Sequence, residues 1–190
     1  MKKPSAILSI LTAGALLLVS ACGKQGGDEF AYLYENLPFK MERVARPSIP
    51  DLRVNIKDFG GVGDGVTLNT EAFAKAMKHL SDKGGGHLDV PAGIWLTGPI
   101  EILSNCDLHV TPNAVIIFDP DRDLYPIIKT VFEGLDPRRC ESPVHAEGAR
   151  NISITGGGVI DGSGEAWRMV KKSKLTEGEW KKLVASGGVV

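Results

Sequence analysis

The chain has 190 residues, of which 43% are hydrophobic and 24% are charged, and its formal net charge is −1. No basic cluster longer than two residues occurs before Lys171 and Lys172. The sequence therefore lacks the basic patches of a nucleic-acid-binding protein, and we expect no nucleic acid as a partner. After a leading targeting segment, the remaining length suits one modest domain, which we expect to be a monomer.

The first 22 residues have the features of a bacterial lipoprotein signal peptide. Lys2 and Lys3 precede an apolar run over residues 6–19, which is short for a membrane span. The run ends in Val19-Ser20-Ala21-Cys22, a pattern typical of the site where the chain is cut and Cys22 is lipidated. An ordinary signal peptide with an incidental cysteine and an uncleaved anchor are the alternatives. We expect the lipid on Cys22 to hold the protein to the outer membrane, on its periplasmic or surface face.

Residues 23–50 are expected to form a tether followed by an irregular arm. The tether is rich in glycine, and Pro38, Pro47 and Pro50 interrupt the arm. Residues 51–190 then form the main domain. Cys106 and Cys140 remain after processing, and the spacing leaves a disulfide and two free thiols equally open.

The main domain begins with a strand and a helix. Residues 53–59 alternate between apolar and polar side chains, which predicts a half-buried strand before the glycine-rich turn 60–65. A helix is predicted over residues 70–82, with Asn69 as its N-cap and three glycines at 84–86 as its end. Its apolar stripe consists of Ala72, Phe73, Ala76, Met77 and Leu80.

Short extended segments separated by turns follow this helix. We predict strands at 87–90, 94–97, 100–103, 107–111, 115–118, 144–146, 151–155 and 159–161. Residues 105–110 and 150–155 look alike, because in each an asparagine-bearing turn leads into a strand with apolar residues two apart. Such repetition indicates coils that stack like strand on like strand, as in a β-helix.

A short helix is predicted over residues 177–185. Thr176 and Glu179 fit a capping box, and Leu175 and Trp180 stand at the positions of a hydrophobic staple. The predicted fold class is therefore mainly β, with a capping helix, the first coils of a β-helix and a short C-terminal helix.

Four segments in order resemble the pectin-lyase-like superfamily, and the last three of them resemble its polygalacturonase branch, glycoside hydrolase family 28. They are residues 56–70, 84–93, 96–100 and 151–164, and the resemblance covers residues 54–167. It implies a right-handed parallel β-helix and an inverting hydrolase whose substrate is galacturonan in pectin. It also implies that Gly63 and Gly65 adopt positive φ after the first strand.

Members of this family share a set of catalytic motifs, and none of these motifs occurs in the 190 residues. The family's carboxylates come from Asn-Thr-Asp and Asp-Asp, supported by Gly-His-Gly and Arg-x-Lys, and the nearest match is Asn69-Thr70-Glu71 on the capping helix. We therefore expect no catalytic residue, no cofactor and no metal here, and an N-terminal fragment that is inactive alone. A non-catalytic polysaccharide-binding lipoprotein and another pectin-lyase-like enzyme, such as a lyase, remain alternatives.

Other residues that could carry chemistry have more ordinary interpretations. Asp161 and Glu165 could form an acid–base pair but flank turn glycines, and Asp64 is expected to bind turn amides. Asp119, Asp121 and Asp123 resemble the start of a calcium loop, but Leu124 and Thr130 occupy positions that need glycine and glutamate.

Histidines and tryptophans complete the candidates. No two of the four histidines share a local metal-ligand spacing; they are His79, His87, His109 and His145. Trp95 and Trp167 could stack on sugar rings, although a place in the core or on the surface of the solenoid is the commoner role.

Overall fold

A computed structural model of the chain describes residues 30–131, 133–135, 138–168 and 170–186. The predicted signal peptide, including Cys22, and most of the tether lie outside these residues. The chain divides into two compact units, one ending at Ala45 and one beginning at Arg46. In the described part of the chain, no helix is long and apolar enough to span a membrane.

The described part of the first unit is irregular, as predicted. It contains one short 3-10 helix, Ala31–Tyr34. The guanidinium of Arg43 lies over the Tyr34 ring, 5.0 Å from its centre, and the Val44 N–H donates to the Tyr34 hydroxyl at 3.2 Å. Tyr34 is thus the residue around which this segment folds.

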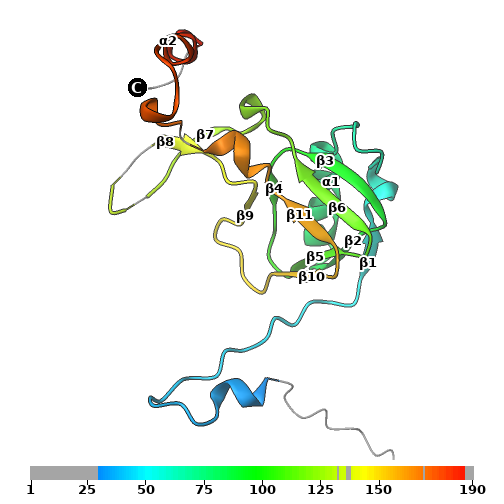
Figure 1. Cartoon of the computed structure of the whole chain (residues 1–190). Coiled ribbons are helices and arrows are strands. Elements are labelled where there is room, and N and C mark those ends of the chain that lie inside the picture. The colour runs from blue at the N-terminus through cyan, green and yellow to red at the C-terminus, as the bar shows by residue number, and fades with distance from the viewer. Residues whose placement is uncertain (1–29, 132, 136–137, 169, 187–190) are drawn as a thin grey trace, which may run out of the picture. The chain divides into compact units, whose positions relative to one another are not determined.

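Parallel strands stacked in sheets form the body of the second unit (Figure 1). One four-stranded sheet has the order β1 (Arg53–Asn55), β2 (Gly86–Val90), β5 (Cys106–Val110), β10 (Ser153–Gly156). A second has the order β11 (Val159–Asp161), β6 (Ala114–Phe118), β3 (Gly93–Thr97). A third pairs β4 (Ile100–Glu101) with β9 (Val144–His145). Because the chain returns repeatedly to the same sheets, the predicted parallel β-helix is confirmed.

Aligned apolar side chains fill the interior of the solenoid. Leu88, Leu108 and Ile154 lie opposite one another across β2, β5 and β10. In the second sheet, Trp95 lies opposite Ile116. Fully burying each such side chain stabilises the fold by about 1.5–3 kcal/mol.

The two asparagine-bearing turns also stack, as their similarity predicted. Asn105 and Asn151 both adopt positive φ, and the Asn151 amide donates to the Asn105 side-chain oxygen at 2.9 Å. The Asn151 amide also pairs with both backbone groups of Ser48, at 2.7 and 2.8 Å. Residues before β1 therefore bind the turn that precedes β10.

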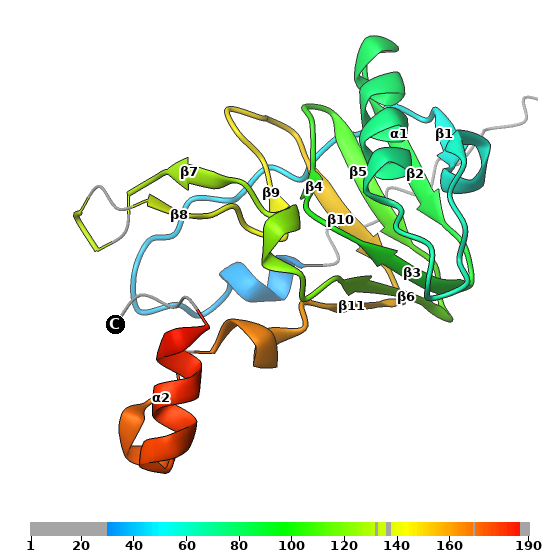
Figure 2. The same ribbon diagram turned by 90° about the horizontal axis from the view of Figure 1, so that it is seen from above.

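Helix α1 (Thr70–Asp82) covers one end of the stack, beside β1 and β2 (Figure 2). Its bounds are those predicted, and all five residues of the predicted apolar stripe are buried. The helix contacts β2 and β4, so its stripe closes the interior of the first coil.

Asn69 is the N-cap residue of α1, as predicted, but its side chain makes no capping hydrogen bond to the helix. Its amide oxygen accepts the Val62 N–H at 2.7 Å, and its nitrogen donates to the carbonyls of Val62, Thr67 and Leu96 at 3.0, 2.7 and 3.1 Å. Buried polar backbone groups need partners, and this fully enclosed amide supplies them where the glycine-rich loop meets β3.

The glycine-rich region also differs from the prediction for residues 53–59. Only β1 is a strand, and Ile56–Phe59 is a 3-10 helix, because the Asn55 side chain accepts the Lys57 N–H and starts a turn. Gly65 has φ +77° as expected. Gly63 does not need positive φ; a β-carbon there would lie 2.9 Å from the Trp95 ring.

An antiparallel hairpin that the sequence did not predict interrupts the solenoid. It consists of β7 (Ile127–Lys129) and β8 (Arg138–Cys140). It lies in the long connection between β6 and β9, so it is an excursion from the coil rather than part of it.

Helix α2 (Glu177–Ala185) matches the predicted bounds. Both halves of the predicted capping box are present: the Thr176 hydroxyl accepts the Glu179 N–H at 3.3 Å, and the Glu179 carboxylate accepts the Thr176 N–H at 2.8 Å. The Thr176 N–H lowers the pKa of Glu179.

Candidate functional site

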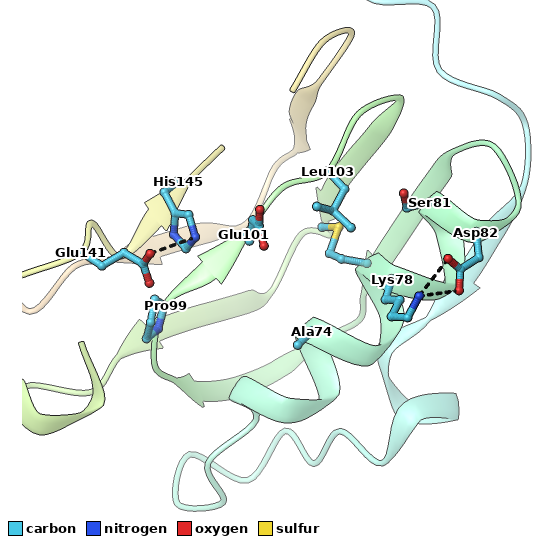
Figure 3. A pocket seen from close by; sticks show the side chains of 10 residues that line it. Ala74, Lys78, Ser81, Asp82, Pro99, Glu101, Leu103, Glu141 and His145 are labelled. Carbon is cyan, nitrogen blue, oxygen red and sulfur yellow. Dashed lines mark hydrogen bonds and ion pairs between the residues drawn. The ribbon is translucent and has the colours of Figure 1, made fainter. Parts of the chain in front are cut away.

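A pocket of about 520 Å³ lies between α1 and the strands β4 and β9 (Figure 3). Ala74 and Lys78 line it from the helix, and Glu101, Glu141 and His145 line it from the strand side. It is concave and brings together titratable groups, which are the usual marks of a candidate site.

The polar groups of this pocket pair with one another. His145 Nε2 lies 3.4 Å from Glu141 Oε1, and Glu101 lies opposite His145 in the β4–β9 register. Lys78 Nζ contacts the Asp82 carboxylate at 2.9 Å. The pocket therefore offers one imidazole with a carboxylate beside it.

This arrangement does not suit glycosidic acid catalysis. A carboxylic acid that must stay protonated near neutral pH needs an apolar surrounding, whereas Glu101 is exposed to solvent. The ammonium of Lys78, on the helix wall, is already paired with Asp82. We therefore assign no catalytic step to this pocket.

A second polar cluster lies on the outer face of the sheet of β1, β2, β5 and β10. Asp107, whose side chain is 1% exposed, is its centre. Its carboxylate is hydrogen-bonded to His87 Nδ1 at 2.8 Å and accepts the hydroxyls of Ser153 and Thr155, both at 2.7 Å. His109 Nδ1 lies 2.7 Å from the Thr155 hydroxyl oxygen.

These contacts determine which ring nitrogen of each histidine carries a proton. Because Thr155 gives its only proton to Asp107, its oxygen accepts from His109 Nδ1–H, and His87 Nδ1–H donates to Asp107 directly. Burial alone would raise the pKa of Asp107, but the bonds from His87, Thr155 and Ser153 outweigh it and hold the pKa below its ordinary value. The cluster joins β2, β5 and β10 and is structural.

Asp161 and Glu165 have the turn and surface roles that the sequence favoured over an acid–base pair. Asp161 accepts the Ser163 N–H at 2.9 Å, a turn contact, and Glu165 is exposed in the short 3-10 helix Gly164–Trp167. Asp64, as predicted, bonds turn amides: the Thr67 and Val66 N–H groups and the Thr67 hydroxyl lower its pKa to about 2.

Two of the three aspartates before β7 also accept backbone N–H groups. Asp119 accepts the Asp121 N–H at 2.8 Å, and Asp121 accepts the Asp123 N–H at 3.0 Å. Among the described residues, no group of three or more His, Cys, Asp or Glu side chains is arranged to hold a metal ion.

The remaining candidates have separate surroundings. His79 packs against the Phe59 ring, with centres 5.4 Å apart. Trp95 is fully buried and donates to the Pro91 carbonyl at 2.8 Å, so it cannot stack on a sugar. Trp167 is half-buried. Cys106 is buried and Cys140 partly exposed, and both are free thiols.

Several known proteins that are similar to this chain are named as polygalacturonases. No family model matches the chain. A Vitis vinifera protein named "Probable polygalacturonase" is 40% identical over 122 residues, which are 60% of this chain and 25% of that protein. An exo-poly-alpha-D-galacturonosidase from Dickeya chrysanthemi is 31% identical over 64% of this chain and 21% of that protein.

Two solved structures are similar in the same way. The hyperthermoactive exopolygalacturonase from Thermotoga maritima matches with a TM-score of 0.61 and 38% identity, over 77% of this chain and 36% of that one. The family 28 exopolygalacturonase from Yersinia enterocolitica matches with a TM-score of 0.58 and 29% identity, over 74% of this chain and 30% of that one. The chain thus spans about a quarter of the length of the curated relatives above.

Proposed function

Since this chain is related, over the part that matches, to the polygalacturonase-like proteins of glycoside hydrolase family 28, we propose that it serves galacturonan hydrolysis as the capped start of such an enzyme. The substrate is the polygalacturonate of pectin, and its linkages are cut with inversion. The observation that carries the proposal is the 38% identity to an exopolygalacturonase over 77% of this chain, with a TM-score of 0.61.

These 190 residues are proposed not to hydrolyse galacturonan alone. Inverting hydrolysis needs two carboxyl groups about 6.5–9.5 Å apart, one to protonate the leaving oxygen and one to activate water. Asp161 is engaged in a turn and Glu101 is exposed, so neither suits the acid role. Coils that stack beyond β10 and β11 would supply the chemistry, and these residues would give them a rigid, capped base.

The protein is further proposed to act at the bacterial envelope, as a monomer anchored to the outer membrane through lipid on Cys22. The apolar run and the four residues ending at Cys22 support this. Growth with radiolabelled palmitate should label the wild type, whereas a Cys22→Ser variant should stay unlabelled. Equal labelling of both would contradict the anchor.

A reducing-sugar assay on polygalacturonate tests the hydrolase proposal. The 190-residue protein is compared with the Thermotoga maritima exopolygalacturonase as a positive control, at equal molar concentration. We expect release by the control and none above the blank from this chain. Release of reducing sugar by this chain that persists through purification would show that its own residues catalyse the reaction. The proposal that further coils supply the catalytic residues would then be wrong.

A further inference from the structure

A second hollow, of about 630 Å³, lies between the β7–β8 hairpin and the 3-10 helix Gly164–Trp167. The residues of its wall that matter here are Ile128, Thr130, Arg139, Glu141, Ser142 and Trp167. We call it the hairpin groove. Its volume falls within the range of about 300–1,000 Å³ that small-ligand sites occupy.

The hairpin places an apolar group, a cation and a carboxylate on one face. Ile128 lies directly opposite Arg139 in the antiparallel register, so both side chains project to the same side. The Glu141 N–H donates to the Pro126 carbonyl at 2.8 Å, which continues the pairing beyond Cys140. Since side chains two apart on a strand share a face, Arg139 and Glu141 stand side by side.

The aromatic wall of the groove is held in place from behind. Tyr125 is buried and donates its hydroxyl proton to the Asp119 carbonyl at 2.8 Å. The Trp167 ring meets Tyr125 edge to face, with centres 4.8 Å apart and planes at 84°. Trp167 is therefore a rigid platform, and its indole N–H, buried at the wall, has no acceptor among the described residues.

The paired strands of the hairpin carry three cations, of which only Arg139 lines the groove, where Glu141 also lies. Lys129 and Arg138 lie opposite each other on the other face of the hairpin, next to Arg139 in the ladder. A local excess of cations attracts a polyanion and raises the rate at which it associates. A neutral ligand would gain nothing from this arrangement.

From this geometry we infer that the hairpin groove binds one uronate residue of an acidic polysaccharide. The inference rests on the proposed function for its substrate class and adds a site that is separate from the chemistry. Arg139 binds the sugar carboxylate, since a guanidinium presents paired N–H donors to it. The Trp167 ring receives an apolar C–H face of the sugar, and Glu141, Ser142 and Thr130 bind hydroxyls.

Calorimetric titration of the full 190-residue protein with trigalacturonate tests this inference, with a neutral galactose trisaccharide as the paired ligand. Arg139→Gln and Trp167→Leu remove the two main groups, while Arg150→Gln and Trp180→Leu are matched controls away from the groove. Thermal unfolding of each variant checks that it folds, and Trp167→Phe replaces Trp167→Leu should the latter not fold.

We expect the acidic trisaccharide to bind the wild type and the neutral one to bind at least about tenfold more weakly, a difference of about 1.4 kcal/mol. Each groove variant should lose about tenfold in affinity for trigalacturonate, and each control should stay within about twofold. Absence of binding to the wild type, equal binding of both trisaccharides, or unchanged affinity in the groove variants would overturn the inference. Because the readout is binding, its failure is distinct from failure of the hydrolase proposal, which the reducing-sugar assay reports.

Discussion

The two ends of the solenoid differ in how far they bury apolar side chains of the same interior row. At the first end, α1 covers the coil, and Leu88 in β2 and Leu108 in β5 are fully buried. At the last coil, Ile154 occupies the same interior row in β10 but is 49% exposed, and Ile160 in β11 is 38% exposed. In a stack of coils, burial depends on the next neighbour, so an interior position is buried only where both neighbours are present.

The open end has a second consequence, for the backbone. In the described part of the chain, β10 and β11 each pair on one side only, with β5 and β6; β1 and β3 are edge strands too, but α1 covers the coil at their end. Unpaired strand edges are templates for pairing with other chains, and here exposed apolar side chains lie beside them. The closed end should therefore determine stability, and the open end should determine association.

Truncation of the shared interior row should give the largest contrast between the ends. Leu108→Ala should reduce the free energy of unfolding by about 2–5 kcal/mol, because it leaves a cavity with neighbours on both sides. Ile154→Ala should cost less than about 1 kcal/mol, since solvent already reaches that side chain. Urea denaturation of both variants measures this, and equal losses would mean that the last coil is covered in solution.

Removal of the Asn69 amide tests the closed end at a polar group. Asn69→Ala leaves the Val62 N–H and nearby carbonyls without their partner, and we expect a loss of about 3 kcal/mol in unfolding free energy. Asn55→Ala is the matched control, because Asn55 only starts a 3-10 turn, and should cost about 1 kcal/mol. A smaller effect at Asn69 than at Asn55 would contradict the role assigned to this buried amide.

The Asp107 cluster joins β10 to β5 and β2, and its disruption should reduce the free energy of unfolding by an intermediate amount. Asp107→Asn should cost about 1.5–3 kcal/mol near neutral pH, because β10 loses a charged acceptor for two hydroxyls. Asp89→Asn, which breaks an exposed ion pair with Arg53, should cost about 0–1 kcal/mol.

The pH dependence of that effect has a definite sign. Because the folded pKa of Asp107 lies below its unfolded value of about 3.9, its stabilisation is complete above that pH and is lost as pH falls through the folded pKa. The difference between wild type and Asp107→Asn should therefore shrink on acidification below about pH 4. A difference that grows there would show that the carboxylate is destabilising when ionised.

The smallest effect is expected at the capping box of α2, which belongs to neither end. Thr176→Ala removes the acceptor of the Glu179 N–H and should destabilise this helix by about 1 kcal/mol. Circular dichroism of a peptide spanning residues 172–186, with and without the substitution, measures it. Unchanged helicity would mean that the box contributes nothing outside the protein.

Local patterns made part of this molecule predictable. The apolar stripe of α1, the Thr176 and Glu179 box, and the repeated asparagine turns each report on neighbours within a few residues, so their helices and strands followed from the sequence. Asparagine is a common N-cap residue, but the side-chain amide of Asn69 is hydrogen-bonded to Val62 and Leu96 instead. No local pattern carries that information.

The clusters were less predictable than the elements. His87 and Asp107 are 20 residues apart, and His109 and Thr155 are 46 apart, so only the stacking register brings them together. Asp107 lies opposite His87 and Ser153 in that register, which alternation along each strand alone cannot determine. The hairpin groove was not predicted, because the sequence between Lys129 and Arg138 contains no two-residue hairpin signature.

Amide hydrogen exchange, followed strand by strand, tests the central claim that the described residues form a parallel solenoid covered by α1 at its first coil and uncovered at β10 and β11. Interior pairing protects amides in proportion to the cost of opening them. We predict strong protection in β2, β5 and β6, with exchange in β10 and β11 faster by orders of magnitude. Protection in β10 and β11 equal to that in β5 and β6 would contradict the account.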